Sequence, residues 1–201
     1  MMRTFGWPEF LFILEAAKWT IALSAIAFAG GSIVGLMVAL ARTAESRVLQ
    51  FAATVFTQIF QGTPLLLQLF LVFFGAPILG LDINPWLAAA AALILNSGAF
   101  LGEIWRGCIQ AVPRGQLEAA QALSLSYYWR MRDVVLPQAM KIAVAPTVGY
   151  LVQIIKGTSL AAIIGFTEIT RAGQIINNAT FQPLVVFLSL IHISEPTRRT
   201  P

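Results

Sequence analysis

Charged residues are scarce in this sequence of 201 residues, and their scarcity excludes an ordinary soluble fold. Asp, Glu, Lys and Arg make up 11% of the chain and hydrophobic residues 58%, whereas a soluble domain has about 25% and roughly 45–50%. So little polar material cannot cover a globule in water, so the outer surface must face lipid. The composition therefore predicts an all-α integral membrane protein, because helices satisfy every backbone polar group internally.

Cysteine and histidine are also rare, which removes several kinds of chemistry. The single Cys108 forms no intramolecular disulfide and His192 is the only histidine, so the sequence has no metal-ligand spacing. No G-x-x-x-x-G-K-[ST] loop occurs, which excludes nucleotide binding by that route. The formal charge is +4, but the basic residues form no patch suited to nucleic acid. We expect no metal, cofactor or nucleic acid to bind this chain.

Long uncharged runs predict the membrane spans. Residues 19–41 carry no charge and exceed the roughly 20 residues needed to cross the hydrocarbon core. Residues 62–64, Gly-Thr-Pro, break the next run, so a span is expected after them and a shorter apolar helix before them. The expected spans are uncharged or nearly so and cover residues 19–41, 64–80, 83–102 and 136–155, with a fifth from Pro183.

Small and basic residues add detail to this arrangement. Gly30, Gly31 and Gly35 in the first span are expected to let another helix approach closely. The segment after Lys156 is interrupted by charge, so we expect a re-entrant or surface helix that is covered by protein. Placing the N-terminus outside leaves seven Lys and Arg on the inner side and four on the outer side, as the positive-inside rule favours.

The last residues, LSLIHISEPTRRTP (188–201), differ from the run before them. A span that begins at Pro183 has about eleven apolar or weakly polar residues before Glu195, which is roughly 16 Å of helix against a core of about 30 Å. Unpaired charges at that depth each cost about 2.5–3.5 kcal/mol. Residues 188–198 also resemble the translation of a sequencing-library adapter. We therefore expect 188–201 to be non-native, leaving four complete spans and a truncated fifth of a five-helix protein.

The charged segment of residues 112–139, between the third and fourth spans, predicts a docking element. Pro113 suits the first turn of a helix, and helix-forming residues follow from Gly115 to Leu123. Several alanines keep one side of this helix thin, as a helix that docks in another protein's groove requires. An ordinary inner loop explains the same composition, and the residues alone leave both interpretations open.

Four stretches of the sequence resemble one family. GQLEAAQALSLS (115–126), followed by LPQA, resembles the EAA loop of permease subunits of ATP-binding cassette importers. Three further stretches resemble the polar-amino-acid branch of these permeases: QGTPLLLQLFLVFF (61–74), LNSGAFLGEIWRGCIQAVPRGQ (95–116) and IIKGTSLAAIIGFTEI (154–169). The resemblance covers residues 16–187 in order, which marks these residues as a permease domain behind an outer segment, 1–15.

The resemblance implies a transport subunit rather than an enzyme. Two permeases, identical or homologous, form a pathway that carries polar amino acids across the bacterial inner membrane by alternating access. A separate cytoplasmic ATPase subunit binds ATP and magnesium, and an extracytoplasmic solute-binding protein delivers the solute. The residues that the resemblance assigns to ATPase coupling are Gly115, Glu118, Ala119, Ala120 and Ser124.

Two further loops belong to the same motifs, and their residues are Gly62, Thr63, Pro64, Lys156, Thr158 and Ser159. The sequence departs from the family pattern at three positions. Gln61 stands where arginine is usual, Gly157 where aspartate is frequent, and Ser124 where glycine is usual. Because serine follows a helix end at positive φ less freely than glycine does, the loop after the coupling helix is the feature most affected.

Polar side chains inside the spans are candidates for the substrate path, and these are Gln68, Asn96 and Gln153. Hydrogen bonding between helices explains the same residues. Glu103 and Arg106, three residues apart, are expected to form an ion pair at the inner end of the third span. A self-sufficient channel or secondary transporter remains the alternative, although it would need ionisable residues within its own spans. An intramembrane enzyme would need a catalytic cluster at membrane depth, which the sequence lacks.

Overall fold

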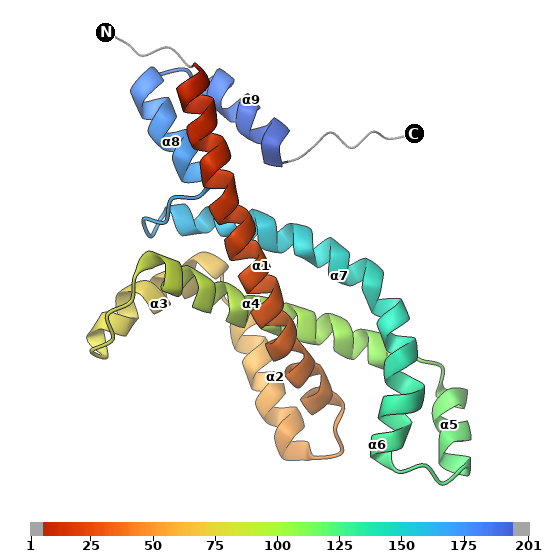
Figure 1. Ribbon diagram of the computed structural model, residues 1–201. Coiled ribbons are helices and arrows are strands. Elements are labelled where there is room, and N and C mark those ends of the chain that lie inside the picture. Colours follow the sequence, from red (N-terminus) through yellow and green to blue (C-terminus); the bar gives the residue numbers. More distant parts are fainter. Residues whose placement is uncertain (1–5, 195–201) are drawn as a thin grey trace, which may run out of the picture.

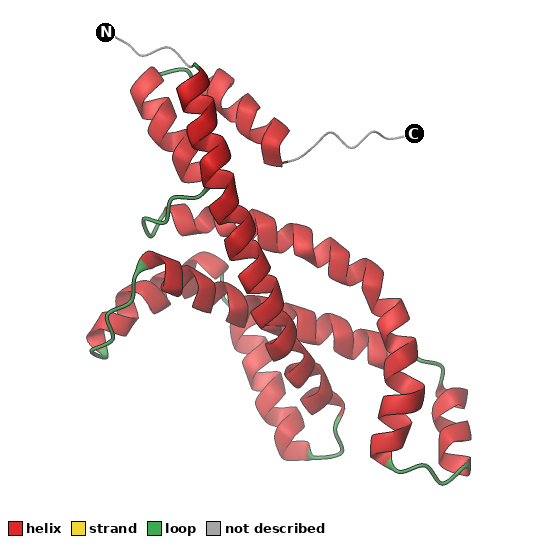
Figure 2. Cartoon of the chain, in the orientation of Figure 1, coloured by secondary structure: helices red, strands yellow, loops and turns green. Residues whose placement is uncertain are grey.

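The computed structural model describes residues 6–194, and every regular element among them is helical (Figures 1 and 2). The helices are α1 (Trp7–Thr43), α2 (Arg47–Gly62), α3 (Leu65–Ile78), α4 (Pro85–Gln110), α5 (Arg114–Ala122), α6 (Tyr127–Trp129), the π-helix η1 (Arg130–Val135), α7 (Leu136–Thr158), the 3₁₀ helix η2 (Ser159–Ala162), α8 (Ile169–Thr180) and α9 (Pro183–Ser194). The all-α expectation is confirmed for these residues.

Three helical runs are long and apolar enough to cross a membrane: α1, α4 and the run Tyr127–Ala162. The pair α2 and α3 makes a fourth if it counts as one bent span. α1 has 37 residues, about 55 Å of helix, and it begins at Trp7, so residues 7–15 are helical and continuous with the residues of the expected first span.

The most extensive helix contact in the described chain is between α1 and α4, which cross near the middle of the molecule (Figure 1). Small residues make it possible. A Cβ atom on Gly31 would lie 2.6 Å from the Ser97 Cβ, and one on Gly35 would lie 2.9 Å from the Leu101 Cβ. Approaches this short are absent between real side chains, so the two backbones meet directly. The expectation of a closely packed glycine stripe is confirmed.

The break at residues 62–64 turns the chain sharply. α2 and α3 meet at 101°, with Pro64 at the N-cap of α3 in extended conformation. α3 has 14 residues, or about 21 Å of helix, which is shorter than the span expected over 64–80. α3 alone is therefore too short to cross a core of about 30 Å, and together with α2 it forms either one broken span or a re-entrant loop.

Residues 112–139, called the coupling segment here because the sequence resemblance assigns ATPase coupling to them, begin with a short helix outside the long apolar helices. α5 follows α4 after a three-residue turn, and α6, η1 and α7 then make one continuous helical run (Figure 1). The run is curved, and Pro146 lies inside α7, where it removes one backbone hydrogen bond. In the apolar window of this run only 11% of residues are buried, against 61% in α4, so α7 exposes most of its surface.

The C-terminal helices α8 and α9 lie beside the N-terminal end of α1 (Figure 1). α8 has 12 residues, about 18 Å, too short to span the core. It packs on α1 through Ile169 and Ile176, which share a buried cluster with Ile13 and with Val186 of α9. α9 extends to Ser194, so residues 188–194 are helical; the remainder of the proposed tail lies outside the described residues.

Candidate functional site

A polar network fastens the break between α2 and α3. Gln68 is 6% exposed, and its Nε2 donates to the Thr63 hydroxyl at 2.9 Å, the Thr63 carbonyl at 3.0 Å and the Phe60 carbonyl at 2.8 Å. A helix end leaves its last carbonyls without partners inside the helix. The Gln68 amide supplies those partners, so one side chain of α3 closes the end of α2.

Asn96 on α4 joins the same network. It is 8% exposed, and its Nδ2 donates to the Gln68 Oε1 at 3.1 Å and to the Phe60 carbonyl at 3.3 Å. Its Oδ1 accepts from the Tyr150 hydroxyl of α7 at 3.5 Å. Beside it, Gln61 donates to the Ala99 carbonyl at 3.2 Å. Two of the three expected path residues, Gln68 and Asn96, therefore meet where α2, α3, α4 and α7 converge.

Gln153 lies apart from this network. It is on α7 and exposed, and among the described residues no hydrogen bond joins it to the network around Gln68 and Asn96. Between α4 and α7 the fixed contacts lie elsewhere, with the Trp105 Nε1 donating to the Thr147 hydroxyl at 2.9 Å and Phe100 stacked on Tyr150. Gln153 faces the surface that α7 leaves open.

The two motif loops come together in space. A Cβ on Gly157, at the end of α7, would lie 3.2 Å from a Leu65 methyl, directly after Pro64. Thr158 is fully buried and donates to the Ile155 carbonyl at 2.7 Å, while Ser159 donates to the Lys156 carbonyl at 2.7 Å. These hydroxyls close the C-terminal turn of α7, so both loops are helix ends that pack side by side.

An ion cluster joins the C-terminal ends of α1 and α4. Glu103 accepts from the Arg106 guanidinium, with the Arg106 Nε at 3.0 Å, and it also lies 3.0 Å from the Arg42 Nη1. The expected pair of Glu103 and Arg106 is present, and Arg42 of α1 makes it a bridge between two helices. Sequence spacing alone misses Arg42, because 61 positions separate it from Glu103.

The coupling helix α5 presents most of its assigned residues to the outside. Gly115, Glu118 and Ala119 are exposed. Ala120 is 3% exposed, so its side chain packs within the chain and is not offered to a partner. The structure therefore gathers three of the four expected residues of this helix on its outer face.

The end of α5 is a Schellman motif built around serine. Ser124 has φ of +58°, the left-handed conformation that glycine adopts most readily. The Leu125 N–H donates to the Ala120 carbonyl at 3.2 Å, and the Ser124 N–H to the Gln121 carbonyl at 2.8 Å. The motif forms in spite of the missing glycine, so Ser124 carries local strain.

Contacts that sequence reasoning did not identify hold the coupling segment to α1. The Tyr127 hydroxyl donates to the Thr43 carbonyl at 3.1 Å, and the Arg130 Nη2 lies 3.5 Å from a Glu45 carboxylate oxygen. Their positions in the chain are 84 and 85 apart, so only the fold brings them together. The segment is thus fixed to the C-terminal end of α1 as well as to α4.

The long apolar helices, the broken second span and the exposed helix between α4 and α7 define a membrane transport component. The sequence profile of the binding-protein-dependent transport system inner membrane component matches residues 31–194, and the chain belongs to this family. A putative glutamine transport system permease protein of Rickettsia felis is 36% identical over 87% of this chain and 81% of its own length. The glutamine transport system permease protein of Escherichia coli K12 is 36% identical over 90% and 84%.

Solved structures agree with this assignment. The chain is similar to an amino acid ABC transporter crystallised with histidines, with a TM-score of 0.85, 31% identity and coverage of 91% of this chain and 86% of that one. A methionine ABC transporter in an inward-facing conformation gives a TM-score of 0.77 at 19% identity, which shows a shared fold.

Proposed function

We propose that this chain is the permease subunit of an ATP-binding cassette importer that moves a polar amino acid across the bacterial inner membrane by alternating access. The observation that carries the proposal is α5, an exposed helix held at fixed geometry between two membrane helices. Because the sequence has no nucleotide-binding loop, transport driven by ATP requires a surface on this chain that contacts a separate ATPase and transmits its conformational change. The amino-acid relatives support the class of solute.

The coupling contact is assigned to the outer face of α5. Gly115, Glu118 and Ala119 offer a small, exposed face with one carboxylate, which suits insertion into a groove of a cytoplasmic ATPase that binds ATP and magnesium. Ala120 and Ser124 support this face from behind, the first by packing inward and the second by ending the helix. Docking then displaces α4 and α7, because α5 is tied to both.

The substrate path is assigned to the region where Gln68, Asn96 and Gln153 lie. Gln68 and Asn96 shape the broken span, and Gln153 lies on the open face of α7, where a second permease copy or homologue completes the pathway. With the N-terminus outside, a solute-binding protein docks at the end that carries α8 and α9. The loops at 62–64 and 156–159 then lie toward that outer half.

We also propose that residues 188–198 derive from a sequencing adapter. Their match to the translated adapter and the charges that follow so few apolar residues support this reading. A sequencing read of the source DNA across codon 187 tests it. Continuation as further apolar codons supports the proposal, whereas Ser-Glu-Pro-Thr-Arg-Arg in the source DNA refutes it.

The function is tested by partner capture and by uptake. The affinity-tagged chain, purified from its source membranes, is expected to bring down an ATP-hydrolysing subunit, and vesicles with that complex and its solute-binding protein should accumulate labelled L-glutamine or another polar amino acid only with ATP. Glu118→Lys should abolish ATP-driven uptake, whereas Glu15→Lys, the same charge change on exposed α1, should preserve it. Uptake without any ATPase would establish a self-sufficient transporter instead.

A further inference from the structure

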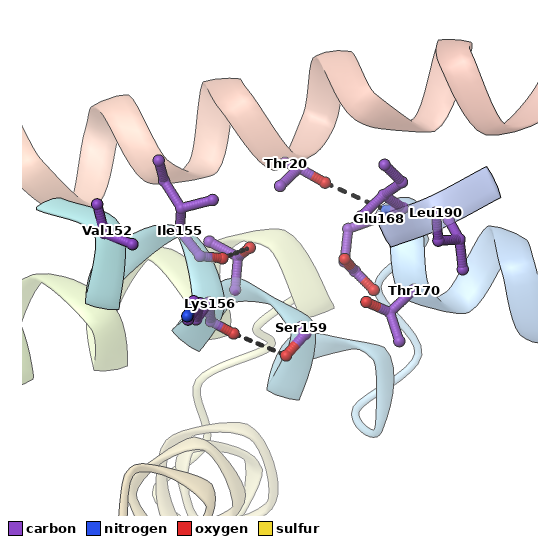
Figure 3. A pocket seen from close by; sticks show the side chains of 10 residues that line it. Thr20, Val152, Ile155, Lys156, Ser159, Glu168, Thr170 and Leu190 are labelled. Atoms are coloured by element: carbon purple, nitrogen blue, oxygen red, sulfur yellow. Dashed lines mark hydrogen bonds between the residues drawn. The ribbon is translucent and has the colours of Figure 1, made fainter. Parts of the chain in front are cut away.

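A cavity of about 460 Å³ lies between α1, the end of α7 and the start of α8 (Figure 3). Its volume falls within the roughly 300–1,000 Å³ of small-molecule sites. None of the residues assigned to the substrate path lines it. The residues around it are Thr20, Val152, Ile155, Lys156, Thr158, Ser159, Glu168, Ile169, Thr170 and Leu190.

Glu168 is the unusual member of this lining. Its side chain is 0% exposed, and it caps α8 by accepting the Arg171 N–H on Oε1 at 2.9 Å. The second carboxylate oxygen, Oε2, is buried and has no hydrogen-bond partner among the described residues. No cation lies within ion-pair distance of the carboxylate in that part of the chain. A buried carboxylate in this state is costly unless something pairs with it.

Lys156 also lines the cavity, and Figure 3 shows its ammonium nitrogen on the side away from the Glu168 carboxylate. The other polar groups, nearer to Glu168, are available chiefly as acceptors. The hydroxyls of Thr158 and Ser159 donate to backbone carbonyls, so their hydrogens are occupied while their lone pairs remain. The Thr20 hydroxyl oxygen already accepts from the Ile169 N–H at 3.2 Å. Figure 3 shows the Glu168 carboxylate turned toward Thr170, on the side of the cavity that Ser159 also borders. A ligand suited to this end of the cavity is a hydrogen-bond donor with positive charge.

We propose that this cavity binds a primary ammonium group, with the Glu168 Oε2 as its main acceptor. An ammonium has three donors and one charge, which matches one unpaired carboxylate oxygen and the nearby hydroxyl oxygens. This inference rests on the proposed function, which makes the α-ammonium of the transported amino acid the expected source. The head group of phosphatidylethanolamine carries the same chemistry and is the other source.

The polar end of the cavity is built from residues that precede the segment proposed to be adapter-derived. Glu168 and Thr170 are held by α8, and the hydroxyls come from α1, α7 and η2. Among the described residues of that segment, Leu190 lines the cavity as an apolar wall.

Carbodiimide labelling of Glu168 tests the site directly. Dicyclohexylcarbodiimide modifies protonated carboxyl groups, and burial raises the pKa of the Glu168 carboxyl against the opposing effect of Thr170 and Arg171. The full chain is placed in phosphatidylcholine nanodiscs, which supply no primary ammonium, and labelling is read by peptide mass spectrometry. L-glutamine at four times its dissociation constant should slow labelling about five-fold. Its deaminated analogue glutaramate should not slow the labelling.

The outcomes of this experiment distinguish an ammonium site from its absence and the amino acid from the lipid as the source of the ammonium. Protection by phosphatidylethanolamine nanodiscs alone, with no further effect of L-glutamine, supports the ammonium site and assigns the lipid as its source. Equal protection by glutaramate, or no protection by any ammonium probe, overturns the proposal. The labelling experiment needs neither the ATPase nor transport, so the two proposals fail separately. If L-glutamine does not protect Glu168 but ATP-driven uptake is intact, the proposed function stands and the ammonium site is refuted. If uptake is absent but L-glutamine still protects Glu168, the proposed function is refuted and the site stands.

Two variants separate binding from folding. Glu168→Gln keeps an amide oxygen to cap α8 but removes the charge, so the variant should fold and L-glutamine should no longer raise its thermal unfolding midpoint. Thr170→Val, which removes a hydroxyl beside the carboxylate, should reduce that ligand-dependent shift without abolishing it. A full L-glutamine shift in the Glu168→Gln variant contradicts the assignment of Oε2.

Discussion

Asn96 of α4 donates a hydrogen bond of 3.1 Å to the Gln68 Oε1 of α3, and both side chains are buried. Gln68 in turn closes the end of α2, so the amide pair joins three helices at the point where the chain turns by 101°. The bend is held by side chains as well as by Pro64. Disrupting one amide should therefore affect the whole turn.

Asn96→Ala should lower the free energy of unfolding by about 1–3 kcal/mol, because it leaves the buried Gln68 Oε1 without its donor. Transport should fall while membrane insertion persists. Gln153→Ala, which removes an exposed amide, is the matched control and should leave thermal stability unchanged. Identical unfolding midpoints for the two variants in detergent would show that the amide pair does not stabilise the bend.

Gly102→Ala should destabilise the fold by about 1–3 kcal/mol through overpacking. A Cβ there would lie 2.6 Å from a Val38 methyl and 3.1 Å from the Gly35 carbonyl. Gly107→Ala on the same helix has nothing within 4 Å and should stabilise by up to about 1 kcal/mol through helix propensity. Thermal unfolding of both variants measures the difference, and a shift of the same sign in both would argue against close α1–α4 packing.

Glu103→Gln should cost about 1 kcal/mol, because it removes the charge that bridges Arg42 and Arg106. Glu15→Gln provides the control, since Glu15 and Lys18 form an exposed pair at 3.8 Å that contributes little. The difference between the variants should shrink in about 1 M salt, where the screening length is about 3 Å. If Glu103→Gln and Glu15→Gln lower the free energy of unfolding equally at low salt, the contacts of Glu103 with Arg42 and Arg106 contribute no more to stability than an exposed ion pair does.

Ser124→Gly should stabilise the coupling segment by about 1 kcal/mol, since glycine relieves the left-handed conformation that serine adopts with difficulty. Ser126→Gly, at a φ of −61°, should bring no gain. Hydrogen exchange at the amides of α5 measures both, and the first variant should slow it. Faster exchange in Ser124→Gly would mean that the serine hydroxyl contributes more than its backbone costs.

Local sequence features predicted much of the fold. Charge spacing located the apolar helices, Gly62 to Pro64 marked the bend, and the stripe that includes Gly31 and Gly35 indicated close packing. These features act within one helix or one turn, so the sequence displays them directly. A helix was expected at about 64–80, and α3 covers Leu65–Ile78. Its angle of 101° to α2 was not predicted, because a proline-containing break shows where a helix stops but not the direction in which the next begins.

The pairings between distant segments were beyond sequence reasoning. Arg42 reaches Glu103, and Tyr127 reaches Thr43, only because α1 crosses α4 and passes the coupling segment. Glu168 looked like a charge that kept its segment out of lipid, and nothing in its spacing indicated that one oxygen is buried without a partner. Such facts depend on packing in three dimensions, which periodicity does not record.

The run from Tyr127 to Ala162 is one continuous curved helix, and Pro146 lies within its α7 portion. One end lies beside the coupling helix, and the other lies at Lys156 and the Glu168 cavity. The region beside α5 and the Glu168 cavity are therefore the two ends of one unbroken helical run, so a displacement at one end has a continuous path to the other.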